Sequence, residues 1–326
     1  MALYRPLLVL ATLLAFGVVS LGAYVRLSDA GLGCPDWPGC YGHLVGVPEA
    51  PHEQTEALRA FPGKPVEAAK AWKEMAHRYV AGTLGLLILA LTILAWRHRV
   101  AAATTTVLAG VVTFQALLGM WTVTLLLKPV IVTAHLLGGM TTLALLVGLI
   151  SRDAQPLRPP NPLDDRSDQP PRMAALAALL AVAVQIALGG WVSSNYAALA
   201  CGDFPTCQGD WLPAMEFGRA FTLHRELGQT AEGGLLPFTA LTAIHWLHRL
   251  WAVVVLLVVG ALAWRLARTP AWRQGGLVLA GLLGLQVVLG IANVLLSLPL
   301  PVAVAHNFGA ALLLAAIVAI NVRCRR

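Results

Sequence analysis

The chain has 326 residues, of which 58% are hydrophobic and 12% are charged. A soluble domain normally has about twice that charged fraction, so the composition excludes a soluble globular protein and indicates an integral membrane protein surrounded by lipid. The formal net charge is +7. The basic residues form no cluster with interleaved aromatic residues, so we expect no nucleic-acid partner.

Eight apolar stretches are long enough to cross a bilayer as helices, which requires roughly 20 residues each. They cover residues 6–25, 74–96, 101–126, 130–150, 173–193, 240–264, 276–298 and 301–321. The predicted fold class is therefore all-α, with eight transmembrane helices. Arginine residues near the helix ends predict that both termini are cytoplasmic, because basic residues remain on that side of the membrane. Long loops over residues 26–73 and 194–239 are then expected outside.

The two halves of the chain repeat each other. The segment "QALLGMWTV" (115–123) matches "QVVLGIANV" (286–294) at an offset of 171 residues, and the same offset takes "VTAHLLG" (132–138) onto "AVAHNFG" (303–309). Toward the start of each half, the offset is 167 residues. Four helices in each half is an even number, which predicts parallel repeats.

Each half is expected to form one four-helix bundle. The first bundle covers residues 1–150, and the second covers residues 173–326. Between them, residues 151–172 are polar and rich in proline. This composition predicts a cytoplasmic linker.

Four histidines lie a few residues inside the outer ends of the apolar stretches. His77 and His135 are 58 residues apart, and so are His248 and His306. Ionisable residues inside hydrocarbon are costly and usually functional. Two imidazoles that face each other across a four-helix bundle suit axial ligation of haem iron, whereas zinc requires more ligands per site. A proton relay or another metal remains the alternative.

The residues around these histidines differ between the halves. Three residues before the first histidine, the first half has Glu74 and the second half has His245. Positions i and i+3 share a helix face, so Glu74 is a candidate for acid–base chemistry beside whatever His77 binds. A capping or snorkelling glutamate is the alternative. Arg78 and Arg249 follow the histidines and are candidates for binding haem propionates or lipid phosphate.

Together, these motifs resemble the haem A synthase family of bacterial and mitochondrial membranes. The resemblance rests on the duplicated plan and on five segments. These are "RLSDAGLGCPDWPGCYG" (26–42), "EMAHR" (74–78), "VTAHLLG", "HWLHR" (245–249) and "AVAHNFG".

The resemblance implies that the C8 methyl of haem O is oxidised to the formyl group of haem A, through hydroxymethyl and gem-diol stages, for a terminal oxidase. It implies that His77 and His135 hold haem O, that His248 and His306 hold a haem b cofactor, and that Glu74 takes part in catalysis. We expect a bacterial inner-membrane protein with its haem sites toward the periplasm. Expected partners are the farnesyl transferase that makes haem O (haem O synthase) and oxidase assembly factors.

Four of the five cysteines lie in the outer loops, as Cys34/Cys40 and Cys201/Cys207, and Cys324 lies in the inner tail. This division suits an oxidising exterior and a reducing interior. The repeat and the resemblance predict one disulfide in each half, covering its haem site. Redox cycling of the thiols is the alternative, and a zinc knuckle lacks ligands.

Other functions share some of these features. A di-haem, quinone-linked electron carrier of the cytochrome b type would use the same histidines without altering either haem. The segment "DDRSD" (164–168) suggests a farnesyl transferase, but a second Asp-rich motif for Mg²⁺ is missing. A disulfide relay usually has a C-x-x-C spacing. Gln115 and Gln286 predict helix–helix hydrogen bonds, and the resemblance fixes no role for residues 222–230.

Overall fold

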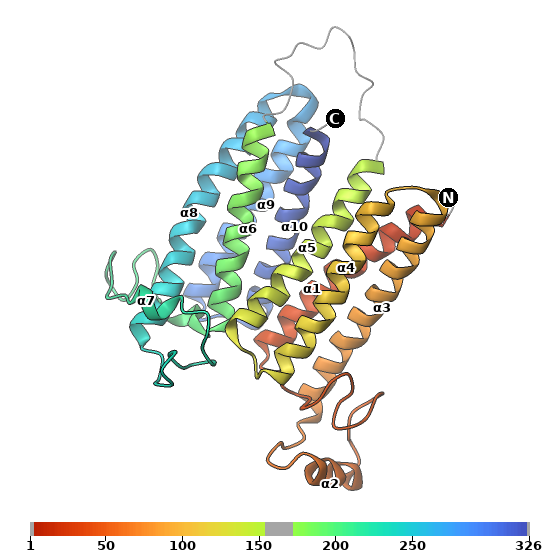
Figure 1. Cartoon of the computed structure of the whole chain (residues 1–326). Helices are drawn as coiled ribbons and strands as arrows, with labels where there is room; N and C mark the ends of the chain where they lie inside the picture. Colours follow the sequence, from red (N-terminus) through yellow and green to blue (C-terminus); the bar gives the residue numbers. More distant parts are fainter. Residues whose placement is uncertain (1–2, 154–171, 325–326) are drawn as a thin grey trace.

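The computed structural model describes residues 3–153 and 172–324. Within this part, eight helices are long and apolar enough to cross a membrane, as predicted (Figure 1). They are α1 (Tyr4–Leu27), α3 (Ala68–His98), α4 (Ala102–Thr124), α5 (Pro129–Asp153), α6 (Arg172–Ser194), α8 (Phe238–Arg268), α9 (Arg273–Leu295) and α10 (Leu300–Cys324). The all-helical prediction is confirmed for the described residues, which form no named strand.

The predicted boundary of α3 is wrong by six residues, since the helix begins at Ala68 and not at Glu74. Its first two turns contain Lys70 and Lys73, whose charges lower the hydropathy, so the apolar stretch begins later than the helix. These turns are helical because lysine and alanine favour a helix. Most of the predicted linker and all of the "DDRSD" segment lie outside the described residues.

The eight helices pack as two groups of four. In the first helix group, α1 contacts α3, α3 contacts α4, α4 contacts α5, and α5 contacts α1. In the second helix group, α6, α8, α9 and α10 contact one another in the same cyclic order. Consequently, α3 stands diagonally across its group from α5, and α8 stands diagonally across from α10.

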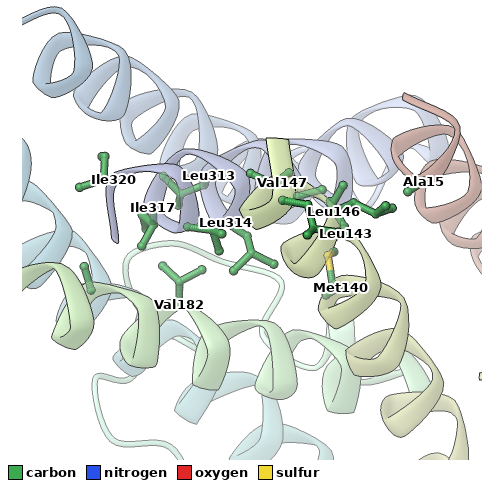
Figure 2. Close-up of a cluster of buried hydrophobic side chains, with 14 of the residues drawn as sticks. Ala15, Met140, Leu143, Leu146, Val147, Val182, Leu313, Leu314, Ile317 and Ile320 are labelled. Carbon is green, nitrogen blue, oxygen red and sulfur yellow. The ribbon is translucent and has the colours of Figure 1, made fainter. Parts of the chain in front are cut away.

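One apolar core joins the two groups, because α10 packs against α1 and α5, and α5 packs against α6. Figure 2 shows Leu143 and Leu146 of α5 beside Leu314 and Ile317 of α10, with Val182 of α6 next to them. Within a bilayer, such contacts gain dispersion energy through close packing, since lipid is as apolar as leucine. The two groups therefore pack as a single body.

The loops that follow α1 and α6 lie at the end of the helices opposite the two termini (Figure 1). They contain the short helices α2 (Pro51–Ala60) and α7 (Phe217–Ala220). At this end the groups are also joined by polar contacts. The Arg26 guanidinium donates to the Ser193 carbonyl at 2.7 Å, and the Tyr196 hydroxyl donates to the Asp29 carboxylate at 3.0 Å.

Candidate functional site

The four predicted ligands lie on the diagonal helices of each group. His77 is on α3 and His135 on α5, whereas His248 is on α8 and His306 on α10. All four side chains are half-buried. Each pair therefore comes from helices that face each other across their group.

Every one of these imidazoles lies against a glycine of a neighbouring helix. A Cβ atom added to Gly22 on α1 would be 3.0 Å from Cε1 of His77. At Gly119, Gly189 and Gly290, the added Cβ would be 3.2 Å from Cε1 of the adjacent histidine. These distances are shorter than ordinary van der Waals contact, so a larger residue at any of these four positions would push the adjacent imidazole aside. Sequence reasoning missed this role, although Gly119 and Gly290 occupy matching places in the repeated "LGMW" and "LGIA" segments.

Two glutamines form hydrogen bonds to the backbone of two of the predicted ligands. Gln115 of α4 donates to the backbone carbonyl of His135 at 2.5 Å, and Gln286 of α9 donates to that of His306 at 3.0 Å. The predicted helix–helix hydrogen bonds are thus confirmed. Each ties the backbone of a histidine to the next helix at the level of the site.

The histidine pairs fit a haem group. Nδ1 of His77, His135 and His306 is buried without a hydrogen-bond partner among the described residues, and such a group is costly unless a ligand satisfies it. No cluster of three or more His, Cys, Asp or Glu residues in the described part is arranged to hold a metal ion. Two imidazoles suffice where a porphyrin supplies the remaining iron ligands.

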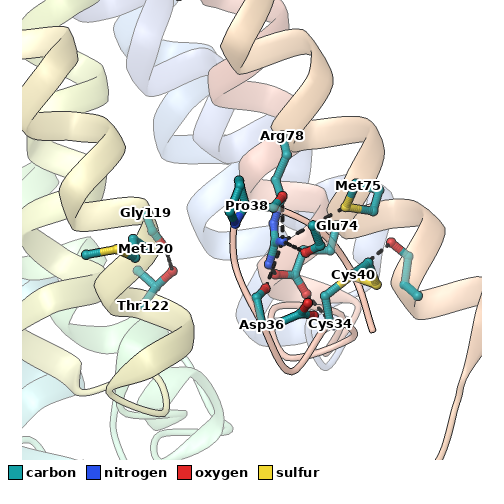
Figure 3. Close-up of polar contacts among 12 residues, drawn as sticks. Cys34, Asp36, Pro38, Cys40, Glu74, Met75, Arg78, Gly119, Met120 and Thr122 are labelled. Atoms are coloured by element: carbon teal, nitrogen blue, oxygen red, sulfur yellow. Dashed lines mark hydrogen bonds and ion pairs between the residues drawn. A yellow bond between two sulfur atoms is a disulfide. The ribbon is translucent and has the colours of Figure 1, made fainter. Parts of the chain in front are cut away.

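Glu74 is buried, with 5% of its surface exposed, and its carboxylate is directed at the disulfide loop that follows α1 (Figure 3). One oxygen accepts the backbone N–H of Cys34 at 2.9 Å, and the other accepts from the Arg78 guanidinium at 2.5 Å. Glu74 therefore does not cap α3, which begins six residues earlier, at Ala68.

Arg78 completes this anchor. Besides Glu74, its guanidinium donates to the carbonyl oxygens of Asp36, Pro38 and Gly39 (Figure 3). The first disulfide loop, closed by the Cys34–Cys40 bridge, is thus held on α3 through backbone groups. The Arg78 guanidinium is already engaged by Glu74 and by the loop carbonyls. Its predicted contact with a haem propionate stays a prediction.

The second disulfide loop, closed by the Cys201–Cys207 bridge, is anchored in the same way. Arg249 donates to the carbonyls of Cys201, Asp203 and Thr206 at 2.6, 2.8 and 2.9 Å. Its propionate contact likewise stays a prediction.

His245 occupies the place of Glu74 in this second anchor. Its two ring nitrogens lie 3.3 Å from the Cys201 amide and 3.2 Å from Nε of Arg249. A neutral imidazole has one acceptor nitrogen, so His245 satisfies one of these donors at a time, whereas the Glu74 carboxylate satisfies both.

An aspartate folds each disulfide loop from within. Asp36 accepts the backbone N–H groups of Tyr41 and Gly42, and Asp203 accepts those of Gln208 and Gly209. The Thr206 hydroxyl and these backbone amides lower the pKa of Asp203 to about 2. The shared aspartate explains why "CPDWPGC" and "CGDFPTC" adopt the same loop.

Comparison with known proteins identifies the chain's relatives. Residues 5–318 match the model of the COX15-CtaA family, which is described as cytochrome oxidase assembly protein. The chain belongs to this family. The heme A synthase of Shewanella oneidensis is 46% identical over 305 residues, which are 93% of this chain and 91% of that protein. Those of Halalkalibacterium halodurans and Caulobacter sp. are each 30% identical, over 76% and 98% of this chain and 78% and 95% of their own lengths.

In this COX15-CtaA family member, residues 222–230 pack onto the ends of the helices that carry the disulfide loops. Arg225 is buried, donates to Asn195 at 2.5 Å and lies 5.6 Å from the Trp191 ring centroid. Glu226 forms an ion pair with Lys128, which precedes α5, at 2.8 Å. The segment therefore links the two helix groups, and the sequence contained no periodicity or motif from which this contact could be predicted.

Proposed function

We propose that this chain is a haem A synthase, an oxidoreductase that converts haem O to haem A by oxidising the C8 methyl to a formyl group. The observation that carries the proposal is the 46% identity to the Shewanella heme A synthase over 93% of the chain. The paired histidines on diagonal helices support it, because they suit two haem groups.

The first helix group is proposed to bind the substrate, haem O, between His77 and His135. The second is proposed to hold haem b between His248 and His306. Haem b, when bound, supplies one-electron redox chemistry. The carboxylate of Glu74 supports this assignment, since the matching residue of the second group is an imidazole.

The role proposed for Glu74 is to accept protons released as the methyl carbon is oxidised. Each carboxylate oxygen has two lone pairs and uses one of them, on Cys34 or on Arg78. With a further backbone contact from Gly33, the carboxylate still keeps at least one of its four lone pairs free. The acceptor nitrogen of His245 is already shared between two donors, so the second helix group lacks this capacity.

The two helix groups, residues 1–150 and 173–326, are proposed to be tandem parallel repeats joined by a cytoplasmic linker, residues 151–172. Contacts between equivalent residues support this proposal. Arg26 and Ser193 are 167 residues apart, as are Asp29 and Tyr196. Equivalent residues of two copies contact each other where a two-fold axis passes between them.

The disulfide loops and haem sites are proposed to face the periplasm of a bacterial inner membrane. The last turns of α3, α5, α8 and α10, at the opposite end, contain arginine, and basic residues favour the cytoplasmic side. Haem O is hydrophobic, so we propose that the farnesyl transferase that makes it delivers it within the membrane. Oxidase assembly factors are proposed as further partners.

The test is to express the chain in membranes that contain haem O and to separate the extracted haems by chromatography. Wild-type protein is expected to produce haem A, whereas a di-haem electron carrier would return only unmodified haem. His77→Ala is expected to abolish haem A while haem b is retained. His248→Ala is expected to lose haem b. Unmodified haem O from the wild type, with haem b bound, would refute the proposed activity.

A further inference from the structure

Gln185 on α6 distinguishes the two histidine pockets. It lies one helical turn before Gly189, the glycine against His248. The offset of 167 residues places Val18 of α1 at the matching position in the first half. Only the second pocket therefore has an amide at this place.

The amide of Gln185 contacts His248 directly. Its Nε2 lies 3.3 Å from each ring nitrogen of His248 and 3.2 Å from the His248 carbonyl oxygen. Its Oε1 is buried without a hydrogen-bond partner among the described residues. In the same pocket the Gln286 amide lies 3.4 Å from Nε2 of His306, but Nδ1 of the other three proposed ligands has no partner among the described residues. Of the four proposed ligands, His248 is the one whose two ring nitrogens both lie within 3.3 Å of a side-chain amide.

A histidine that binds iron through one nitrogen keeps an N–H on the other. An acceptor for that N–H fixes the ring orientation and makes the ligand more basic. The Gln185 amide is equally close to both ring nitrogens, so it reaches whichever one faces away from the iron. The oxygen and nitrogen of a glutamine amide exchange places by a half-turn. This rotation gives up the hydrogen bond from Nε2 to the His248 carbonyl and brings the unpaired Oε1 to the ring.

We propose that Gln185 is a positioning residue for His248: its amide oxygen accepts the N–H that His248 retains as an iron ligand, and this lowers the reduction potential of the haem held there. The inference rests on the proposed function, which assigns haem b to this pocket. Val18 offers no such acceptor, so the first pocket lacks this effect.

The experiment is a potentiometric titration of the purified full-length protein, with haem b quantified as the pyridine haemochrome. Gln185→Val is expected to retain haem b and to favour reduction by about tenfold, which is about 59 mV for a one-electron couple. Gln185→Glu, which keeps an acceptor oxygen, is expected to have a midpoint at or below that of the wild type. Val182→Ala, a packing change on the same helix, is the matched control and is expected to leave the midpoint unchanged.

An unchanged midpoint in haem-loaded Gln185→Val would overturn the inference, and so would an equal rise in Val182→Ala. If Gln185→Val loses its haem, Gln185→Glu decides, because a rise in its midpoint would also overturn the inference. Haem extraction separates this failure from that of the proposed function. A wild type that forms haem A beside an unshifted Gln185→Val refutes only the role of Gln185, and a wild type that binds haem b without forming haem A refutes only the proposed activity.

Discussion

Replacing Glu74 with histidine would give the first helix group the residue that the second already has. The substitution keeps one hydrogen-bond acceptor beside Cys34 and Arg78 and removes the carboxylate. A hydrogen bond to a charged group contributes about 1.5–3 kcal/mol, so losing one of the two anchors is expected to cost roughly 2 kcal/mol of local stability. The backbone carbonyls around Arg78 continue to accept its other N–H groups, as they do around Arg249.

The catalytic effect is expected to be much larger than this structural one. Loss of a positioned general base lowers rates by about 10²–10⁴-fold, so Glu74→His is predicted to reduce haem A formation by at least the lower of these factors. The assay is the rate of haem A accumulation, measured by extraction and chromatography at equal protein and haem b content. Glu56→Gln, which changes an exposed carboxylate on α2, is the matched control and is expected to behave as the wild type.

Haem A formation, measured together with the state of the first disulfide, separates the anchoring role of Glu74 from its proton-accepting role. If Glu74 serves only to anchor the loop, Glu74→His retains haem A synthesis, because His245 anchors the second loop in the same position. Wild-type rates in a Glu74→His protein with its disulfide intact would refute the proton-accepting role. Haem A formation lost in both Glu74→His and Glu74→Gln would support it, provided that the disulfide is intact and that loop reduction is accelerated no more than the loss of one anchor, about 2 kcal/mol, accounts for.

Three further predictions concern the scaffold. Gly119→Ala is expected to displace the adjacent imidazole, to cost about 1–3 kcal/mol of stability through overpacking and to lower the amount of bound substrate haem. The control is Gly110→Ala on the same helix, where an added Cβ meets nothing within 4 Å; it is expected to leave stability and haem content unchanged. Gln115→Leu removes the bond to the His135 carbonyl and is expected to cost about 0.6–2 kcal/mol, read as a lower thermal unfolding temperature in detergent. Asp203 has a depressed pKa of about 2, so its contribution is present at pH above the unfolded value and lost as the pH falls through about 2. Reduction of the second disulfide by an acid-stable phosphine is therefore expected to stay slow down to about pH 4 in the wild type and to be faster in Asp203→Asn at that pH.

The sequence allowed the spanning helices and the histidine pairs to be predicted, because hydrocarbon thickness sets helix length and an ionisable residue inside an apolar run is conspicuous. The anchoring of the disulfide loops was not predictable. Cys34 and Glu74 are 40 residues apart, and their contact depends on how the intervening loop folds back onto α3. The glycines against the imidazoles occur at equivalent positions of the two repeats in the sequence. A small residue in a membrane helix usually indicates close helix packing and not a neighbouring ligand, so their role beside the histidines was not predicted.

The differences between the two sites lie in a few side chains on a common scaffold. Both have an arginine on the loop carbonyls, a glycine against each histidine and a glutamine on one ligand's backbone. The first adds a spare lone pair of Glu74, which a site that collects protons requires. The second has His245, whose acceptor is already engaged, and Gln185 beside the proposed iron ligand His248. This arrangement suits a site whose ligand geometry must stay fixed while electrons pass. This distribution is the physical reason for proposing that the methyl group is oxidised at the first site and that electrons are transferred at the second.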